Sequence, residues 1–144
     1  MNALRGSKHG PRRICGRWGR RAAAAVEMAV VSPLLFAMLF GIIEYGWVFS
    51  VRQTLTTAAR EGARLASLPG SSESQVQQRV NEVVGPLGLA GVVRTQLTRS
   101  TIDEPTENLR VWVHYGDVTL VGQFFGSTNF NLEAVCSMRK EGMD

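Results

Sequence analysis

The chain contains few of the residues that build catalytic and metal sites. Its 144 residues include two histidines, His9 and His114, and two cysteines, Cys15 and Cys136. These four lie far apart, and none of the spacings typical of zinc ligands, phosphate-binding loops or catalytic nucleophiles occurs. We therefore expect a protein that is not an enzyme and that binds no metal and no cofactor.

Acidic residues are missing from residues 1–21, and any charge is missing from residues 28–43. The first segment carries +7 and the rest of the chain −3, which together give the formal +4. The leucine, isoleucine, phenylalanine and valine side chains of 28–43 favour membrane insertion by about 3 to 5 kcal/mol. The positive-inside rule predicts that residues 1–21 stay in the cytoplasm and that the C-terminal part crosses the membrane. The predicted parts are a basic cytoplasmic leader (1–22), a transmembrane helix (23–51) and an exported domain (52–144), where the boundary after residue 22 is implied by the family resemblance described below. The high isoelectric point arises from the leader, so we expect no nucleic-acid partner.

Two glutamates delimit the apolar run. Glu27 and Glu44 are separated by about 26 Å of helix at 1.5 Å per residue, which is close to the roughly 30 Å hydrocarbon core of a bilayer. Both carboxylates can therefore lie near an interface, and Glu44 either marks the end of the span or contacts a partner. Tyr45 and Trp47 fit an aromatic belt at the exit side, and Pro33 should bend the helix.

The helix is expected to continue past the membrane until Pro69-Gly70 ends it. Ala58, Gly62 and Ala66 form a row of small residues on its apolar face, which lets another backbone approach closely. This row could pack against the protein's own sheet or against a neighbouring subunit. Both alternatives remain open from the sequence.

The exported part shows helix and strand signals in turn. A second helix is predicted over Glu73–Val84, where Ser72 and Gln75 form a capping-box pattern and Gly85-Pro86 stops the helix. Strands are predicted over 92–98 (weakly), 109–115 and 130–139 from the alternation of apolar and polar residues, with 117–120 prolonging or following the middle strand. Residues 101–108 and 122–129 are expected to be connections. Cys136 is expected in the core, and His114 on the surface or in a cross-strand pair.

These elements predict an α+β fold of pilin-like type. A long N-terminal transmembrane helix continues into an exported domain with a second helix and a small antiparallel sheet of three or four strands. With 74 residues beyond Gly70, the core is expected to be thin and to gain stability from the long helix or from partners.

Residues 20–66 resemble the TadE-like family. The resemblance rests on RRAAAAVEMAVVSPLLFAMLFGIIEYGWVF, followed by RQTLTTAAREGARLA. Members of this family are minor pseudopilins of the tight-adherence (Flp, type IVb) pilus system. The resemblance implies a role in assembling such a pilus or a related secretion apparatus, in the bacterial inner membrane with the N-terminus in the cytoplasm. The implied partners are the membrane, a prepilin peptidase, the major and minor pilins of the same system and an inner-membrane assembly platform.

The same resemblance implies roles for three residues. A prepilin peptidase would cut between Ala22 and Ala23, which makes Glu27 the fifth residue of the mature chain. Here Ala22 replaces the glycine, and Met28 the aromatic residue, that the family usually has. Glu27 would pair with the new α-amine of a neighbouring subunit; the alternative is an interfacial carboxylate with a topological role only. The alternative function is an uncleaved single-pass anchor whose exported domain scaffolds a secretion machine or binds an extracellular ligand.

Overall fold

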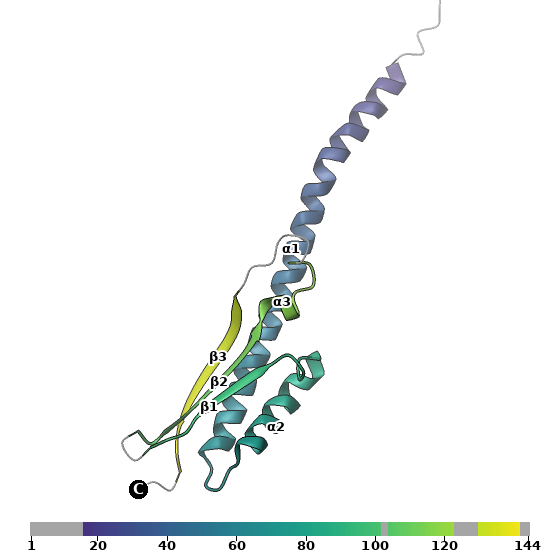
Figure 1. Ribbon diagram of the computed structural model, residues 1–144. Coiled ribbons are helices and arrows are strands. Elements are labelled where there is room, and N and C mark those ends of the chain that lie inside the picture. Colours follow the sequence, from purple (N-terminus) through teal and green to yellow (C-terminus); the bar gives the residue numbers. More distant parts are fainter. Residues whose placement is uncertain (1–15, 102–103, 123–129, 142–144) are drawn as a thin grey trace, which may run out of the picture. The chain divides into compact units, whose positions relative to one another are not determined.

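The structure is a computed structural model that describes residues 16–101, 104–122 and 130–141 (Figure 1). His9 and Cys15 lie outside the described residues, as does most of the predicted connection 122–129. The chain divides into two compact units, Met1–Leu39 and Phe40–Asp144. Helix α1 (Gly16–Ser67) supplies the described part of the first unit and the first element of the second.

Helix α1 is apolar and exposed over its N-terminal half. Its large apolar side chains from Val26 to Leu39 are all exposed, and the helix continues through Pro33. Among the described residues, one helix, Arg21–Ser67, is long and apolar enough to cross a membrane. The helix ends at Ser67, and Gly70 follows with a φ of 78°, so the predicted stop at Pro69-Gly70 is confirmed.

Helix α2 (Glu73–Val84) has the bounds that the sequence predicts. Its first turn is closed by the predicted capping box. The Gln75 backbone N–H donates to the Ser72 hydroxyl at 3.3 Å, and the Ser72 N–H donates to the Gln75 side-chain oxygen at 3.0 Å. Three valines spaced at four-residue intervals are buried along one face: Val76, Val80 and Val84. A short 3-10 helix, η1 (Gly85–Leu87), follows.

Three antiparallel strands form the sheet in the order β1-β2-β3. They are β1 (Arg94–Thr98), β2 (Thr106–His114) and β3 (Asn131–Arg139). The predicted fold class, α+β with a small antiparallel sheet, is confirmed. Two boundaries of the middle strand differ from the prediction. Residues 106–108 belong to β2 and not to a loop, and residues 115–118 form the helical turn α3 (Tyr115–Val118) and not a strand.

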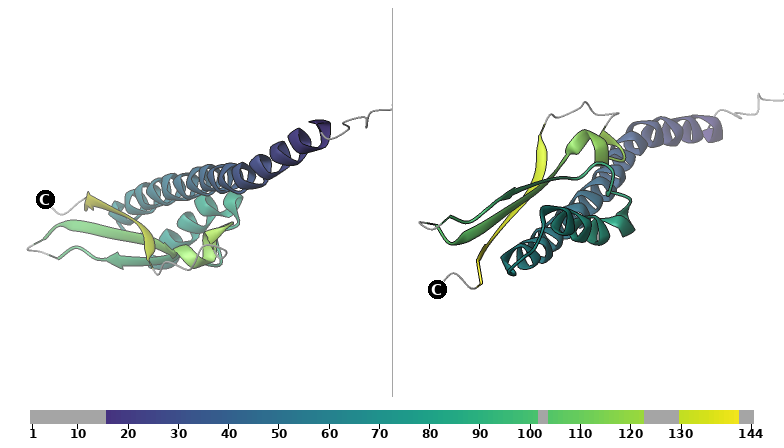
Figure 2. Two further views of the ribbon diagram at one scale, coloured as in Figure 1. Left: turned by 90° about the horizontal axis from the view of Figure 1, so that it is seen from above. Right: turned by 60° about the horizontal axis from the view of Figure 1, so that its bottom comes forward.

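The C-terminal part of α1 and helix α2 cover one face of the sheet (Figure 2). Alternate residues of β2, namely Leu109, Val111 and Val113, are buried on that face. Cys136 of β3 is half-buried against the same core, as expected. On β2, His114 Nδ1 lies 3.0 Å from Asn131 Oδ1 across the strand pair, which confirms a cross-strand role.

Candidate functional site

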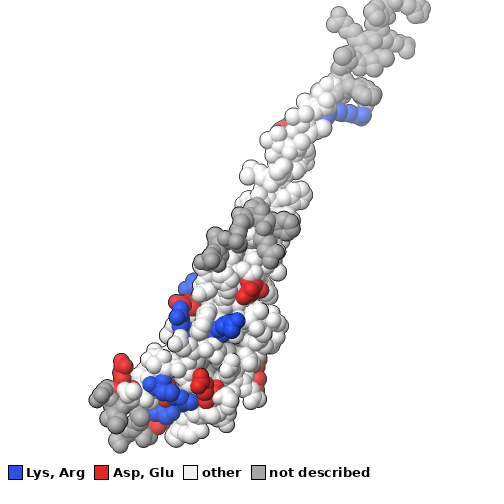
Figure 3. Space-filling model, viewed as in Figure 1, with Lys and Arg blue, Asp and Glu red and all other residues white. Residues whose placement is uncertain are grey.

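The predicted processing and assembly residues lie on the exposed part of α1. Ala22, Ala23 and Glu27 are all exposed. Within the described part of the chain, the Glu27 carboxylate makes no hydrogen bond or ion pair. In Figure 3 the visible face of this part of the helix is almost entirely uncharged. Because α1 begins at Gly16, the Ala22–Ala23 bond lies inside the helix, whereas the prediction put it just before the helix.

Glu44 is the centre of a polar cluster in the second unit. Its Oε1 accepts hydrogen bonds from the Tyr115 hydroxyl, at 2.9 Å, and from the Thr119 hydroxyl. Its Oε2 accepts from the backbone N–H groups of Leu120, at 3.0 Å, and Val121, at 2.9 Å. Four donors thus converge on one carboxylate, and charge-assisted hydrogen bonds of this kind are stronger than neutral ones.

Local geometry aims these donors at Glu44. The single turn α3 is closed by the Thr119 N–H, which donates to the Tyr115 carbonyl at 3.0 Å. This turn puts both hydroxyls on the side of Glu44. The next turn is tight, because the Gly122 N–H donates to the Thr119 hydroxyl at 2.7 Å. A Cβ at Gly122 would collide with that hydroxyl and would lie 3.0 Å from the Tyr115 oxygen.

Two aromatic residues, Trp47 and Phe130, contact α3. The Trp47 indole N–H donates to the Val118 carbonyl at 2.6 Å. The ring of Tyr115 stacks on that of Phe130, with centroids 4.6 Å apart. Trp47 is therefore half-buried inside the protein and is not available as the belt residue that the sequence suggested, whereas Tyr45 is 73% exposed. Val51, the last residue of the predicted transmembrane segment, is also buried in the protein's own core.

The row of small residues packs within the chain. Ala58 and Ala66 are buried, and so is Gly62. A Cβ added at Gly62 would meet the Leu109 side chain of β2 and would lie 3.0 Å from Val80 of α2. The sequence left two alternatives open, and in the structure α1 docks on the protein's own sheet. The buried row leaves no room there for a second subunit's backbone.

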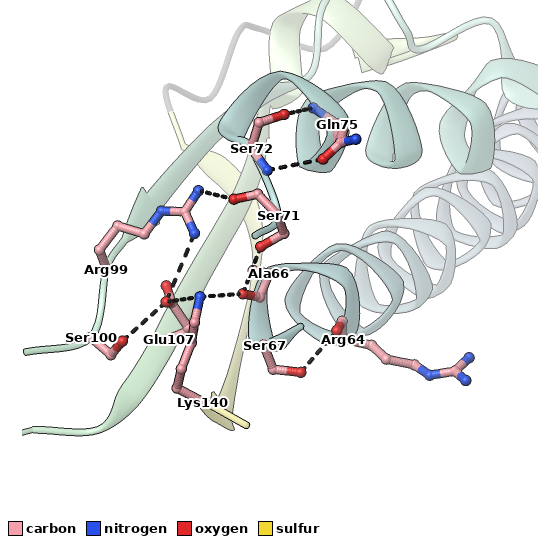
Figure 4. Close-up of polar contacts among 10 residues, drawn as sticks. All are labelled: Arg64, Ala66, Ser67, Ser71, Ser72, Gln75, Arg99, Ser100, Glu107 and Lys140. Atoms are coloured by element: carbon pink, nitrogen blue, oxygen red, sulfur yellow. Dashed lines mark hydrogen bonds and ion pairs between the residues drawn. The ribbon is translucent and has the colours of Figure 1, made fainter. Parts of the chain in front are cut away.

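A second polar network closes the C-terminal end of α1 (Figure 4). The Lys140 ammonium donates to Glu107 Oε1 at 3.1 Å and to the Ala66 carbonyl at 3.2 Å. The Ser100 hydroxyl also donates to Glu107 Oε1, at 3.1 Å, and an Arg99 nitrogen lies 3.9 Å from the same atom. Glu107 is 1% exposed, and its Oε2 has no partner among the described residues. Lys140 thus neutralises a buried carboxylate and at the same time donates to a carbonyl in the last turn of α1.

Three further ion pairs lie on the surface of the second unit. Arg79 of α2 contacts Glu61 and Glu82, each at 3.2 Å, and these two carboxylates raise the pKa of the guanidinium. On the outer face of the sheet, Arg110 pairs with Glu133 and its guanidinium lies 5.2 Å from the Trp112 ring centroid. In the part of the chain that the structure describes, no group of three or more His, Cys, Asp or Glu residues could hold a metal ion.

The comparisons with known proteins agree with the resemblance read from the sequence. Residues 22–64 match the family described as TadE-like protein. The match spans the exposed part of α1, both glutamates of the apolar run and most of the buried small-residue row. It links the chain to the Tad (Flp) pilus system. No curated protein and no solved structure matches the chain.

Several site residues escaped the sequence analysis. Tyr115 and Thr119 contact Glu44 from 71 and 75 residues away, and no periodicity links positions so distant. Glu107 sits in a polar stretch that predicts a loop, although its spacing of two from Leu109 continues the buried alternation of β2. That spacing was the one available signal for Glu107.

Proposed function

We propose that the protein is a TadE-like minor pseudopilin that acts in the assembly of a Tad (Flp, type IVb) pilus or a related secretion apparatus. One observation carries the proposal. The segment that matches the family, residues 22–64, combines an exposed apolar helix with a continuation that docks into a folded α+β unit. A helix of this kind can anchor in a membrane at one end and display a domain at the other.

The proposed orientation follows from charge. The arginines up to Arg21 remain on the cytoplasmic side, and the folded unit lies on the extracytoplasmic side of the inner membrane. Glu44 then marks the outer end of the span, since Trp47 and Val51 pack within the folded unit. The proposed partners are the major and minor pilins of the same system, the inner-membrane assembly platform and a prepilin peptidase.

Glu27 is proposed to act in assembly. Its carboxylate is exposed on an apolar helix surface and has no ion pair within the described residues. A charge in that position is costly near lipid unless it finds a partner, and the α-amine of a neighbouring processed subunit would supply one. The interaction would fix the axial stagger between subunits.

The test of this role is a Glu27→Leu variant, with Met28→Leu as the matched control one residue further along the exposed surface. Glu27→Leu eases membrane insertion by removing a charge, so we expect normal protein levels in the membrane but loss of pilus or secretion output. Glu27→Asp should be partly impaired because it keeps the charge but shortens the reach. Normal output of Glu27→Leu at normal protein levels would show that the carboxylate is a topological marker only.

A second candidate function is a permanently anchored scaffold that is not processed. It is favoured by the position of the Ala22–Ala23 bond inside α1, because proteases cut extended, accessible segments most readily. The two candidates differ in the mass of the protein from native membranes. A chain that begins at Ala23 only when a prepilin peptidase is present, and that disappears in Ala22→Trp, supports the pseudopilin. A full-length chain both in the presence and in the absence of the peptidase supports the scaffold.

A further inference from the structure

The segment after α3 carries an exposed apolar side chain at the level of Glu44 on α1. The backbone N–H groups of Leu120 and Val121 are held by Glu44 Oε2, so this part of the backbone lies beside the turn of α1 that contains Glu44. The Leu120 side chain is 55% exposed. Ile43 and Tyr45, the neighbours of Glu44 on α1, are also exposed. Apolar groups from two distant segments therefore reach the surface at the same height along the helix.

The described residues around Leu120 lack charged side chains. Residues 118–122 and 130–132 contain no Lys, Arg, Asp or Glu. The outer face of the sheet, in contrast, carries Arg94, Arg110 and Glu133 as exposed residues. Charged side chains are expensive within the hydrocarbon of a bilayer, whereas a surface that faces only water has no such reason to exclude them.

Hydrogen bonding gives a second argument. A backbone N–H close to hydrocarbon is costly when it lacks an acceptor. Glu44 provides acceptors for Leu120 and Val121, and the hydroxyls of Tyr115 and Thr119 are bound at the other oxygen. Every donor aimed at Glu44 is thus satisfied within the chain, and the Leu120 side chain can enter an apolar phase without exposing an unpaired amide at this point.

We propose that residues 119–121, held by Glu44, form a second contact with the membrane, at the extracytoplasmic surface of the same bilayer that α1 crosses. Leu120 is the side chain that enters the boundary between headgroups and acyl chains, and Glu44 is the positioning residue that sets its depth. The contact would restrain the folded unit against tilting on its helix. The proposal rests on the membrane orientation given under the proposed function.

Depth-dependent fluorescence quenching tests this contact in the full chain reconstituted into phosphatidylcholine–phosphatidylglycerol vesicles. In a Cys15→Ser, Cys136→Ala background, Leu120→Cys carries an NBD label in one sample. Leu35→Cys, within the apolar part of α1, and Gln77→Cys, on the exposed face of α2, carry it in the other two. Lipids with a doxyl group near the top or near the end of the acyl chain are the quenchers, used in separate samples. We expect blue-shifted emission at positions 35 and 120, with loss of fluorescence by the deep quencher at 35 and by the shallow quencher at 120, and neither change at position 77.

The three labels separate failure of this proposal from failure of the anchor. If the label at 35 is quenched but the label at 120 behaves like the one at 77, the second contact is overturned and the anchor is left intact. Absence of quenching at 35 overturns the insertion of α1 in the bilayer, and the contact with it. Blue-shifted emission at 120 without doxyl quenching identifies a protein neighbour and also overturns the proposal.

Glu44→Ala tests the positioning role in the same assay. The variant removes the acceptor of all four donors, so quenching at 120 should fall while quenching at 35 is retained. Glu61→Ala, which removes a surface carboxylate that pairs with Arg79, is the matched control and should leave both signals unchanged. Full quenching at 120 in Glu44→Ala would refute the assignment of Glu44 as the residue that sets the depth of Leu120.

Discussion

Removing the Lys140 ammonium should destabilise the folded unit far more than the loss of a surface charge. Lys140→Met keeps much of the side chain's apolar length but leaves Glu107, which is 1% exposed, without its closest cation. Breaking a buried ion pair from one side costs about 3–5 kcal/mol. Arg99, at 3.9 Å, and Ser100 still face the carboxylate, so we expect the lower end, about 3 kcal/mol.

Urea unfolding of the full chain in detergent micelles, followed by tryptophan fluorescence, measures this change. With a slope of about 1–3 kcal/mol per molar urea for a unit of this size, the midpoint should fall by roughly 1–3 M. Lys140→Met combined with Glu107→Leu should recover most of the loss, because replacing both partners of a buried pair by apolar groups is often neutral. Arg110→Met, which breaks the exposed pair with Glu133, should cost at most about 1 kcal/mol. The reasoning is refuted if Lys140→Met is as mild as Arg110→Met, or if the double variant is as unstable as the single one.

Two further predictions concern α1. In Glu44→Gln, the amide N–H groups of Leu120 and Val121 lose a charged acceptor, whose hydrogen bonds contribute about 1.5–3 kcal/mol each. The hydrogen exchange of these two amides, measured by mass spectrometry or NMR, should therefore accelerate about tenfold to a hundredfold. Unchanged exchange would contradict the contact with Glu44. Gly62→Ala should lower the urea midpoint, because overpacking costs about 1–3 kcal/mol and exceeds the gain in helix propensity of about 1 kcal/mol. Gly46→Ala, on the same helix with no atom within 4 Å of the added Cβ, should not lower it, and equal behaviour of the two variants would show that the packing at Gly62 yields easily.

Local signals in the sequence account for most of the elements. The bounds of α2 follow from a capping box and a valine stripe, which act within a few residues of each other. The inward faces of β2 and β3 follow from alternation with a period of two. The end of α1 follows from Pro69-Gly70, because proline lacks the N–H and glycine tolerates a positive φ.

The polar sites could not be predicted in the same way, since they depend on tertiary contacts. Glu107 occupies an inward position of β2, where a charge argues against a strand until Lys140 is known to neutralise it. Tyr115 continues the apolar alternation of β2, yet it begins α3 because its hydroxyl and the Thr119 hydroxyl bind Glu44. Trp47 was expected in a membrane belt because it lies close to Glu44 in the sequence. Its hydrogen-bond partner, the Val118 carbonyl, lies 71 residues away and could not be inferred from the sequence.

The network at the end of α1 also bears on when the fold can form. Lys140 reaches back 74 residues to the Ala66 carbonyl, and the Glu141 N–H donates to the Ser67 carbonyl at 3.0 Å. Contacts of such large sequence separation form late, because the intervening chain must first be ordered. Until residue 140 has been synthesised and exported, Glu107 lacks its closest cation, and closing the sheet on α1 buries a carboxylate that faces only Arg99, at 3.9 Å, and Ser100. We therefore expect the helices and the hairpin of β1 and β2 to form first, and the sheet to pack stably on α1 only once residue 140 is available.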